Sequence, residues 1–191
     1  MTSQTDTYAT ITLPARGDLL IGMGDFHGHY PALETLLGSL DTVYQIFENK
    51  QRLILKDNVT LVCTGDYIDR GESSLKVIDT FKKLARKNPG RVVTLTGNHE
   101  LMALADLDCA REALKETASQ DPNDYYTRYT AYGAGGSLHG YNGGIDFIKE
   151  FGSNPEEALR NYVKRMSKEG DVGRWMRKLK PCALMDFEGT K

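Results

Sequence analysis

The chain has 191 residues, enough for one domain with a sizeable buried core. Hydrophobic residues make up 40% and charged residues 26% of it, and the formal net charge is −2. This balance is typical of a globular protein and gives no electrostatic reason to expect nucleic acid or an anionic membrane as a partner. The sequence contains no signal-peptide pattern and no run of about 18 apolar residues, so we predict a cytoplasmic protein.

Short apolar runs alternate with helical patterns along the first half of the chain. The runs predict buried strands at residues 19–24, 59–64 and 91–96. The helical patterns predict three helices. The first lies at residues 31–40, the second begins at a serine cap at residue 73 or 74 and ends at residues 88–90, and the third lies at residues 101–117. Alternating strands and helices predict an α/β fold with a largely parallel or mixed sheet. In such sheets, ligands bind beyond the carboxyl ends of the strands.

The second half of the chain has a different character. Residues 121–144 contain five tyrosines and a glycine-rich stretch, which predicts a structured loop over one surface. Asn154 is expected to cap a helix that begins at Pro155, and a short helix is expected from Asp171. A strand at 181–187 and a turn at 188–190 follow, and the chain stops where a returning strand is expected. We interpret residues 1–191 as one domain that is incomplete at its carboxyl end.

Three short polar motifs follow the three predicted strands. They are Gly24-Asp25-Phe26-His27-Gly28, Gly65-Asp66-Tyr67-Ile68-Asp69-Arg70-Gly71 and Gly97-Asn98-His99-Glu100. A single motif of this kind is more often a turn than a site. Three of them, each after a strand, predict one site at the carboxyl edge of the sheet.

Four side chains of these motifs are suited to metal ions. Asp25 and His27 alternate in what we expect to be an extended segment, so both can face one ion. The Asp66 carboxylate can bridge two ions, and Asn98 offers an amide oxygen to the second. Hard oxygen ligands mixed with imidazole suit Mn, Fe or Zn. Two such ions would lower the pKa of a bridging water and hold the oxygens of a phosphate.

Three further side chains have no obvious duty as ligands. Arg70 has the planar donor fork that suits a phosphate. His99 can protonate a departing alkoxide, and Asp69 can hold the His99 ring through its other nitrogen. We therefore expect these residues to perform proton transfer and phosphate binding.

The motifs resemble the signature triplet of the phosphoprotein phosphatase (calcineurin-like) metallophosphoesterases, and the resemblance runs from about residue 19 to at least residue 104. It implies a central β-sandwich flanked by helices and two bound metal ions. It also implies hydrolysis of phosphomonoesters by a metal-activated water, in the manner of protein serine/threonine phosphatases. The tyrosine–glycine insert is more similar to bacterial or Shewanella-type members than to the compact eukaryotic enzymes.

The resemblance also implies a role for each motif residue. Asp25, His27 and Asp66 would bind the first metal, and Asp66 and Asn98 would contribute to the second. His99 would be the general acid, supported by Asp69. Phosphate binding would fall to Arg70, Asn98 and His99. The expected substrate is a phosphorylated protein or a small phosphate ester.

One part of the family pattern is missing. The family supplies two later histidines to the second metal and a second phosphate-binding arginine, and we find none of them here. The second metal site is therefore predicted to be incomplete. Two alternatives stay open: a dinucleoside polyphosphate hydrolase, which shares the three motifs, and a catalytically silent module that binds phosphate or a partner.

Other reactive side chains are given structural roles. His29 is expected to be exposed near a helix start, and His139 to be a satisfied or exposed loop histidine rather than the missing ligand. The tyrosines of residues 121–144 are expected to pack rather than to bind substrate. Cys63 lies in an apolar run and is expected to be a buried, inert thiol.

Overall fold

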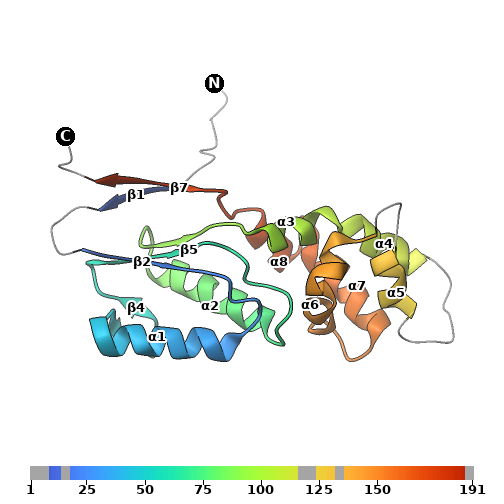
Figure 1. Ribbon diagram of the computed structural model, residues 1–191, viewed down its shortest axis with the longest axis horizontal. Helices are drawn as coiled ribbons and strands as arrows, with labels where there is room; N and C mark the ends of the chain where they lie inside the picture. The colour runs from blue at the N-terminus through green and yellow to red at the C-terminus, as the bar shows by residue number, and fades with distance from the viewer. Residues whose placement is uncertain (1–8, 14–17, 116–123, 132–135, 188–191) are drawn as a thin grey trace, which may run out of the picture.

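A three-stranded parallel sheet forms the centre of the amino-terminal half in the computed structural model, which describes residues 9–13, 18–115, 124–131 and 136–187 (Figure 1). Its strands are β2 (Leu19–Met23), β5 (Val59–Cys63) and β6 (Val92–Thr94), in the order β2-β5-β6. All three lie within the predicted strands, which confirms that prediction. Because the strands are parallel, the three motifs that follow them leave the sheet at the same edge.

Two helices lie on one side of this sheet (Figure 1). They are α1 (Tyr30–Tyr44), with Pro31 in its first turn, and α2 (Ser74–Lys87). Leu33 and Leu37 of α1 and the apolar face of α2, including Phe81 and Leu84, are buried in one hydrophobic core, in which α1 contacts α2 and α2 contacts β6. Spacing of three or four residues between apolar side chains places them on one helix face, which is why both helices were predictable.

The amino terminus of α2 is capped from the other half of the molecule. Ser73 is the N-cap residue, as predicted, but its side chain makes no capping hydrogen bond. Glu150 replaces it, because its carboxylate accepts from the backbone N–H groups of Ser74 (2.5 Å) and Leu75 (2.9 Å). Burial raises the pKa of Glu150, although these two N–H groups oppose the shift. This contact joins the sheet half to the helical half.

Helices make up the carboxyl-terminal half (Figure 1). They are α3 (Asn98–Ala105), α4 (Leu107–Lys115), α5 (Asp124–Ala131), the π-helical turn η1 (Gly140–Gly144), α6 (Ile145–Lys149), α7 (Pro155–Met166) and α8 (Asp171–Met176). The Asn154 side chain accepts from Glu157 N–H (3.0 Å), so the predicted cap of α7 is confirmed. The helix predicted at 101–117 is two helices, which meet at Asp106.

The prediction of a loop over residues 121–144 is wrong for the part that the structure describes. Tyr125 and Tyr129 lie four residues apart and bury their rings on one face of α5. Tyrosine and threonine are not strong helix formers, but burial of the two rings outweighs that preference. The glycine-rich end of the segment forms η1, with Gly143 at φ 97°.

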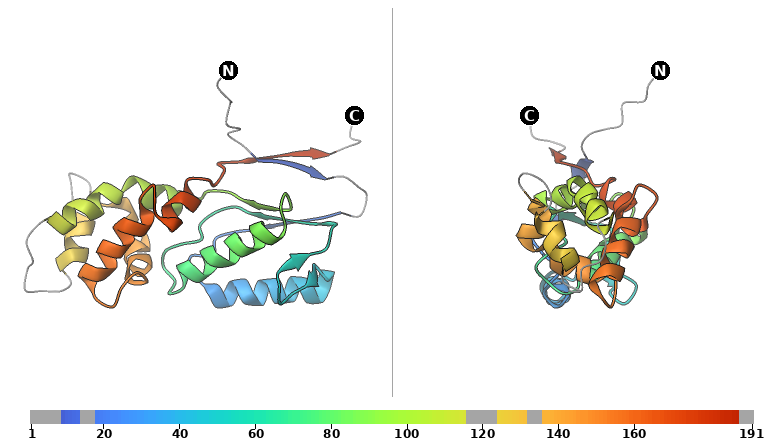
Figure 2. Two further views of the ribbon diagram at one scale, coloured as in Figure 1. Left: turned by 180° about the vertical axis from the view of Figure 1, so that it is seen from behind. Right: turned by 90° about the vertical axis from the view of Figure 1, so that its right-hand side faces the viewer.

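Two strand pairs complete the described fold. Strands β1 (Ala9–Leu13) and β7 (Ala183–Phe187) pair in parallel and lie apart from the central sheet (Figures 1 and 2). Strands β3 (Phe47–Asn49) and β4 (Ile54–Leu55) form a short antiparallel hairpin between α1 and β5. Only β7 was predicted, and the turn predicted at 188–190 lies outside the described residues. Among the helices that the structure describes, none is long and apolar enough to cross a membrane.

Cys63, at the end of β5, is fully buried in the core. Burial raises the pKa of its thiol to about 12. The side chain is therefore a thiol rather than a reactive thiolate at neutral pH, as the sequence predicted.

Candidate active site

The first two motifs form loops that are joined by backbone hydrogen bonds. His27 N–H donates to the carbonyl of Asp66, and Gly28 N–H donates to the carbonyl of Tyr67, both at 2.9 Å. Gly65 lies so close to the third motif that a Cβ atom on it would be 2.2 Å from Gly97 N. The glycines of the motifs therefore permit the three strand ends to meet.

The backbone of the first two motifs is held in an uncommon conformation. Five of their non-glycine residues have φ between 44° and 76°: Asp25, His27, Asp66, Asp69 and Arg70. Such left-handed conformations cost about 1–3 kcal/mol each and gather at functional sites. The expectation that Asp25 and His27 alternate in an extended segment is wrong, because the chain turns sharply at the end of β2.

A cluster of possible metal ligands lies where the loops meet. His27, Asp66 and His99 each offer a ligand atom, and these atoms lie within 4.8 Å of one another. Asp25, a predicted ligand, is exposed and is not part of this cluster. Asn98 is exposed at the first turn of α3, and its role as a ligand stays a prediction.

The two imidazole rings of the cluster point their Nε2 atoms toward the same place. His27 Nδ1 lies 3.1 Å from the carbonyl oxygen of Ile68, which can only accept, so Nδ1 carries the proton and Nε2 a lone pair. His99 Nδ1 lies 2.7 Å from a carboxylate oxygen of Asp69, so its Nε2 carries a lone pair in the same way. This is the arrangement that a metal-binding histidine needs.

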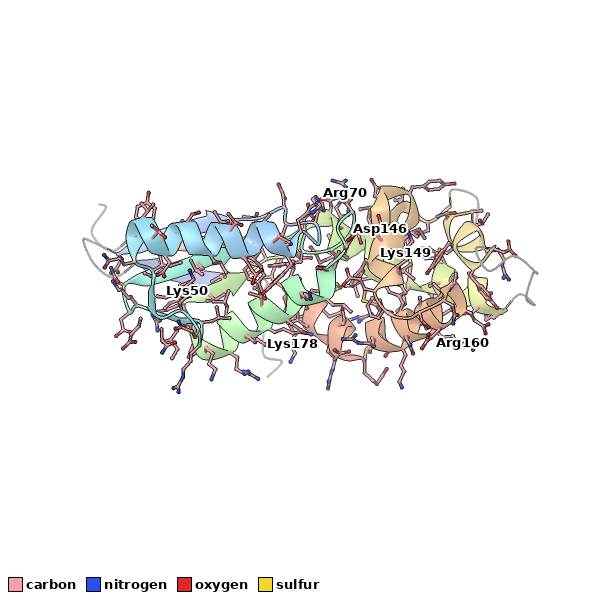
Figure 3. All side chains as sticks on the ribbon, turned by 90° about the horizontal axis from the view of Figure 1, so that it is seen from below. Lys50, Arg70, Asp146, Lys149, Arg160 and Lys178 are labelled. Carbon is pink, nitrogen blue, oxygen red and sulfur yellow. The ribbon has the colours of Figure 1, made fainter. Side chains whose placement is uncertain are left out.

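The Arg70 guanidinium spans the Nε2 atoms of these two rings, which are in edge-to-face contact with 4.6 Å between their centroids. Its Nη1 donates to His27 Nε2 and its Nη2 to His99 Nε2, each at 3.2 Å. Figure 3 shows Arg70 at the junction of the two halves, and its backbone N–H donates to the carbonyl of Gly143 (3.2 Å). The Nε2 lone pairs of His27 and His99, with the Asp66 carboxylate nearby, form a donor set that fits a Mn, Fe or Zn ion.

Glu100 organises the loops, a role that the sequence reasoning missed. Its Oε2 accepts from the N–H groups of Asp66 and Gly97, and its Oε1 accepts from Tyr67 N–H, all at 2.9 Å. The side chain is fully buried. Burial raises the pKa of Glu100, and the three N–H groups oppose that shift. Its place three residues after Gly97, at the start of α3, was the signal for such a contact.

Glu100→Gln is expected to lower the free energy of unfolding by about 2 kcal/mol, because a glutamine offers one acceptor oxygen to three N–H donors and leaves a buried donor unsatisfied. Urea denaturation of both proteins measures the change. The matched control is Glu157→Gln, which alters an exposed carboxylate at the start of α7 and should change stability by less than about 0.5 kcal/mol. Equal stability of Glu100→Gln and the parent protein would show that the three bonds do not organise the loops.

Asp69 joins two histidines. The predicted hydrogen bond to His99 Nδ1 is present at 2.7 Å, and the other carboxylate oxygen lies 2.9 Å from Nε2 of His139. Asp69 and His139 are fully buried. His139 is therefore a satisfied histidine outside the metal cluster, as expected, but it lies in a helical turn and not in a loop. The catalytic roles of Asp69 and His99 stay predictions.

The predicted exposure of His29 and packing of Tyr125 and Tyr129 agree with the fold, whereas the predicted packing is wrong for Tyr141. His29 is exposed at the N-cap of α1. Tyr125 and Tyr129 are packed in the core, whereas Tyr141 is 68% exposed. Of the other two tyrosines of residues 121–144, Tyr126 is partly buried and Tyr132 lies outside the described residues.

The calcineurin-like phosphoesterase family model matches residues 20–181, so the chain belongs to this family. The resemblance of the three motifs and the predicted α/β fold class are thereby confirmed.

Three known proteins that are similar to this chain are each longer than it is. An uncharacterised protein of Schizosaccharomyces pombe is 38% identical over 87 residues, which are 44% of this chain and 25% of that protein. A cold-active protein tyrosine phosphatase of known structure is 22% identical with a TM-score of 0.44, covering 91% of this chain and 40% of its own. A mutant of a cold-active protein tyrosine phosphatase is 21% identical with a TM-score of 0.41, and the match covers 85% of this chain and 42% of that protein. The chain thus spans less than half the length of each.

Proposed function

We propose that this protein is a metal-dependent phosphoesterase that hydrolyses phosphomonoesters. The observation that carries the proposal is the convergence of His27, Asp66 and His99, whose ligand atoms come from three separate strand ends and lie within 4.8 Å of one another. Family membership supports the same chemistry. A sheet edge that gathers imidazole and carboxylate groups beside an exposed arginine is suited to a cation and a phosphate together.

The chain supplies ligands and a proton donor for this reaction. His27 and Asp66 of the cluster would hold metal ions, together with the exposed Asp25 and Asn98 of the same motifs. Such ions would lower the pKa of a bound water, so that it would supply a hydroxide nucleophile for phosphorus near neutral pH. The buried Asp69 carboxylate holds the His99 ring through Nδ1, so that Nε2 faces the site; with a proton on both ring nitrogens, His99 would deliver the Nε2 proton to the leaving oxygen.

Arg70 is the proposed phosphate ligand. Its guanidinium is exposed and shares its N–H groups between two imidazole nitrogens. A phosphate offers stronger, charged acceptors than imidazole does, so the fork would turn to the substrate when one is bound. That movement would also free His27 Nε2 for a metal ion.

We propose phosphoserine or phosphothreonine in a protein as the substrate class, because the Arg70 side of the site is exposed. The rival substrate is a dinucleoside polyphosphate. A silent binding module is the second alternative: of the four histidines in the sequence, His29 and His139 lie outside the ligand cluster. The His139 ring is bound to Asp69, and His29 lies exposed at the N-cap of α1.

The test combines metal content with turnover. The purified chain is loaded with Mn²⁺, its metal-to-protein ratio is measured, and phosphate release is followed from a phosphoserine peptide, a phosphothreonine peptide and a dinucleoside tetraphosphate. Bound metal with release from the peptides supports the proposal. Turnover of the dinucleoside tetraphosphate alone would make the protein a dinucleoside polyphosphate hydrolase. A metal-to-protein ratio of one or less, without any turnover, would identify a silent module.

A further inference from the structure

A buried chain of three hydrogen bonds runs from the site into the helical half. It links His99 to Asp69 (2.7 Å), Asp69 to Nε2 of His139 (2.9 Å), and Nδ1 of His139 to the hydroxyl of Tyr129 (2.7 Å). His99 is 2% exposed and the other three residues are fully buried. Buried polar groups with good partners hold one another in place, because water cannot compete for the bonds.

The direction of each hydrogen bond in this series follows from which atoms can donate and which can only accept. An ionised carboxylate only accepts, so His99 Nδ1 and His139 Nε2 both carry protons directed at Asp69. His139 Nδ1 is then a lone pair, and the Tyr129 hydroxyl donates to it. Burial raises the pKa of Tyr129, which keeps that hydroxyl protonated.

The ring of His139 is held on several sides. A carboxylate oxygen of Asp106 accepts from both His139 N–H (2.8 Å) and the Ser137 hydroxyl (2.9 Å), which anchors the turn that carries the ring. Gly144 lies against the imidazole, since a Cβ atom there would be 2.5 Å from it. The Tyr162 ring lies nearly parallel to it, with 6.0 Å between centroids.

We propose that His139 and Tyr129 are positioning residues for proton donation by His99. With only His99 bound, the Asp69 carboxyl group could turn about its side-chain bond and take the His99 ring with it. His139 occupies the second oxygen and fixes the carboxyl plane, while Tyr129 fixes the tautomer of His139. The helical half thus completes the site of the sheet half. This inference rests on the proposed phosphoesterase function.

The kinetic test compares leaving groups. p-Nitrophenolate leaves without a proton, whereas the alkoxide of phosphoserine needs one, so a misplaced acid affects the second substrate more. His139→Leu is expected to lower kcat for a phosphoserine peptide about 10–100-fold, the size of effects seen when a supporting hydrogen bond is removed, and to lower it far less for p-nitrophenyl phosphate. His139→Gln, whose amide can donate to Asp69, should restore part of the loss.

Tyr129→Phe removes one hydroxyl and nothing else, so it carries the same comparison if His139→Leu does not fold. Its matched control is Tyr125→Phe. Tyr125 is a buried tyrosine on the same helix, and the hydroxyl that this change removes bonds to Glu156 instead of to a histidine. The control should leave the ratio of the two kcat values unchanged. Equal losses on both substrates in the His139 and Tyr129 variants would overturn the positioning role.

Nitrogen NMR of ¹⁵N-histidine protein gives a readout that needs no turnover. Four histidines allow each ring to be assigned. We expect His139 as the Nε2–H tautomer and His99 with a proton on Nδ1, and we expect Tyr129→Phe to shift the His139 Nδ1 signal. An Nδ1–H tautomer at His139 would contradict the inference. If the parent protein hydrolyses neither substrate, the proposed function fails, while the NMR result still decides whether the chain of bonds exists.

Discussion

Asp66→Asn is expected to abolish metal binding and hydrolysis. Asp66 is the carboxylate of the ligand cluster, and the substitution removes the negative charge that a divalent ion needs. Loss of a direct ligand should weaken metal affinity by more than the roughly 10–100-fold expected for a residue that only supports a ligand. The metal-to-protein ratio after dialysis and the rate of phosphate release measure the two effects.

The fold should survive this change. The Asp66 carboxylate accepts from His99 N–H at 3.1 Å, and an asparagine oxygen can accept the same bond. Asp108→Asn is the control, because Asp108 lies on the exposed face of α4 in an ion pair with Arg111. Wild-type metal content and activity in Asp66→Asn would rule out a role for Asp66 as a ligand that bridges two ions.

His99→Asn is expected to lower kcat for a phosphoserine peptide by about 10²–10⁴-fold, the range typical of a lost general acid. The asparagine amide can still donate to Asp69, so the loop should keep its structure. The loss should be much smaller for p-nitrophenyl phosphate, whose leaving group needs no proton. Steady-state kinetics on both substrates, with metal content measured in parallel, tests the assignment.

Metal content decides between the two roles that His99 can have. Its ring belongs to the ligand cluster, but the sequence predicted it as the acid. An unchanged metal-to-protein ratio in His99→Asn supports the acid. A ratio that falls with kcat would make His99 a ligand and leave the proton donor unassigned. His29→Asn serves as the control, since His29 is exposed at the N-cap of α1, where asparagine is well tolerated.

The sequence alone determined the central sheet and the location of the site. Strands β2, β5 and β6 are apolar runs whose pattern is local, and the three motifs follow them directly. Helices α1 and α2 were visible for the same reason, because apolar spacing along a helix does not depend on distant partners. Parallel strands end at one edge, so even the meeting of His27, Asp66 and His99 followed from local signals and topology.

Tertiary structure alone decided the short strands, the helical character of residues 124–131, and the supporting contacts of the site. Strands β3 and β4, of three and two residues, are too short to carry a pattern of their own, and β1 is defined by its pairing with β7 at the far end of the sequence. Glu150 caps α2 from 75 or 76 residues away, and His139 reaches Asp69 across 70 residues. Such contacts form because packing brings polar groups together in a buried place where each must find a partner. That requirement has no signature in the neighbouring residues, so only the fold reveals it.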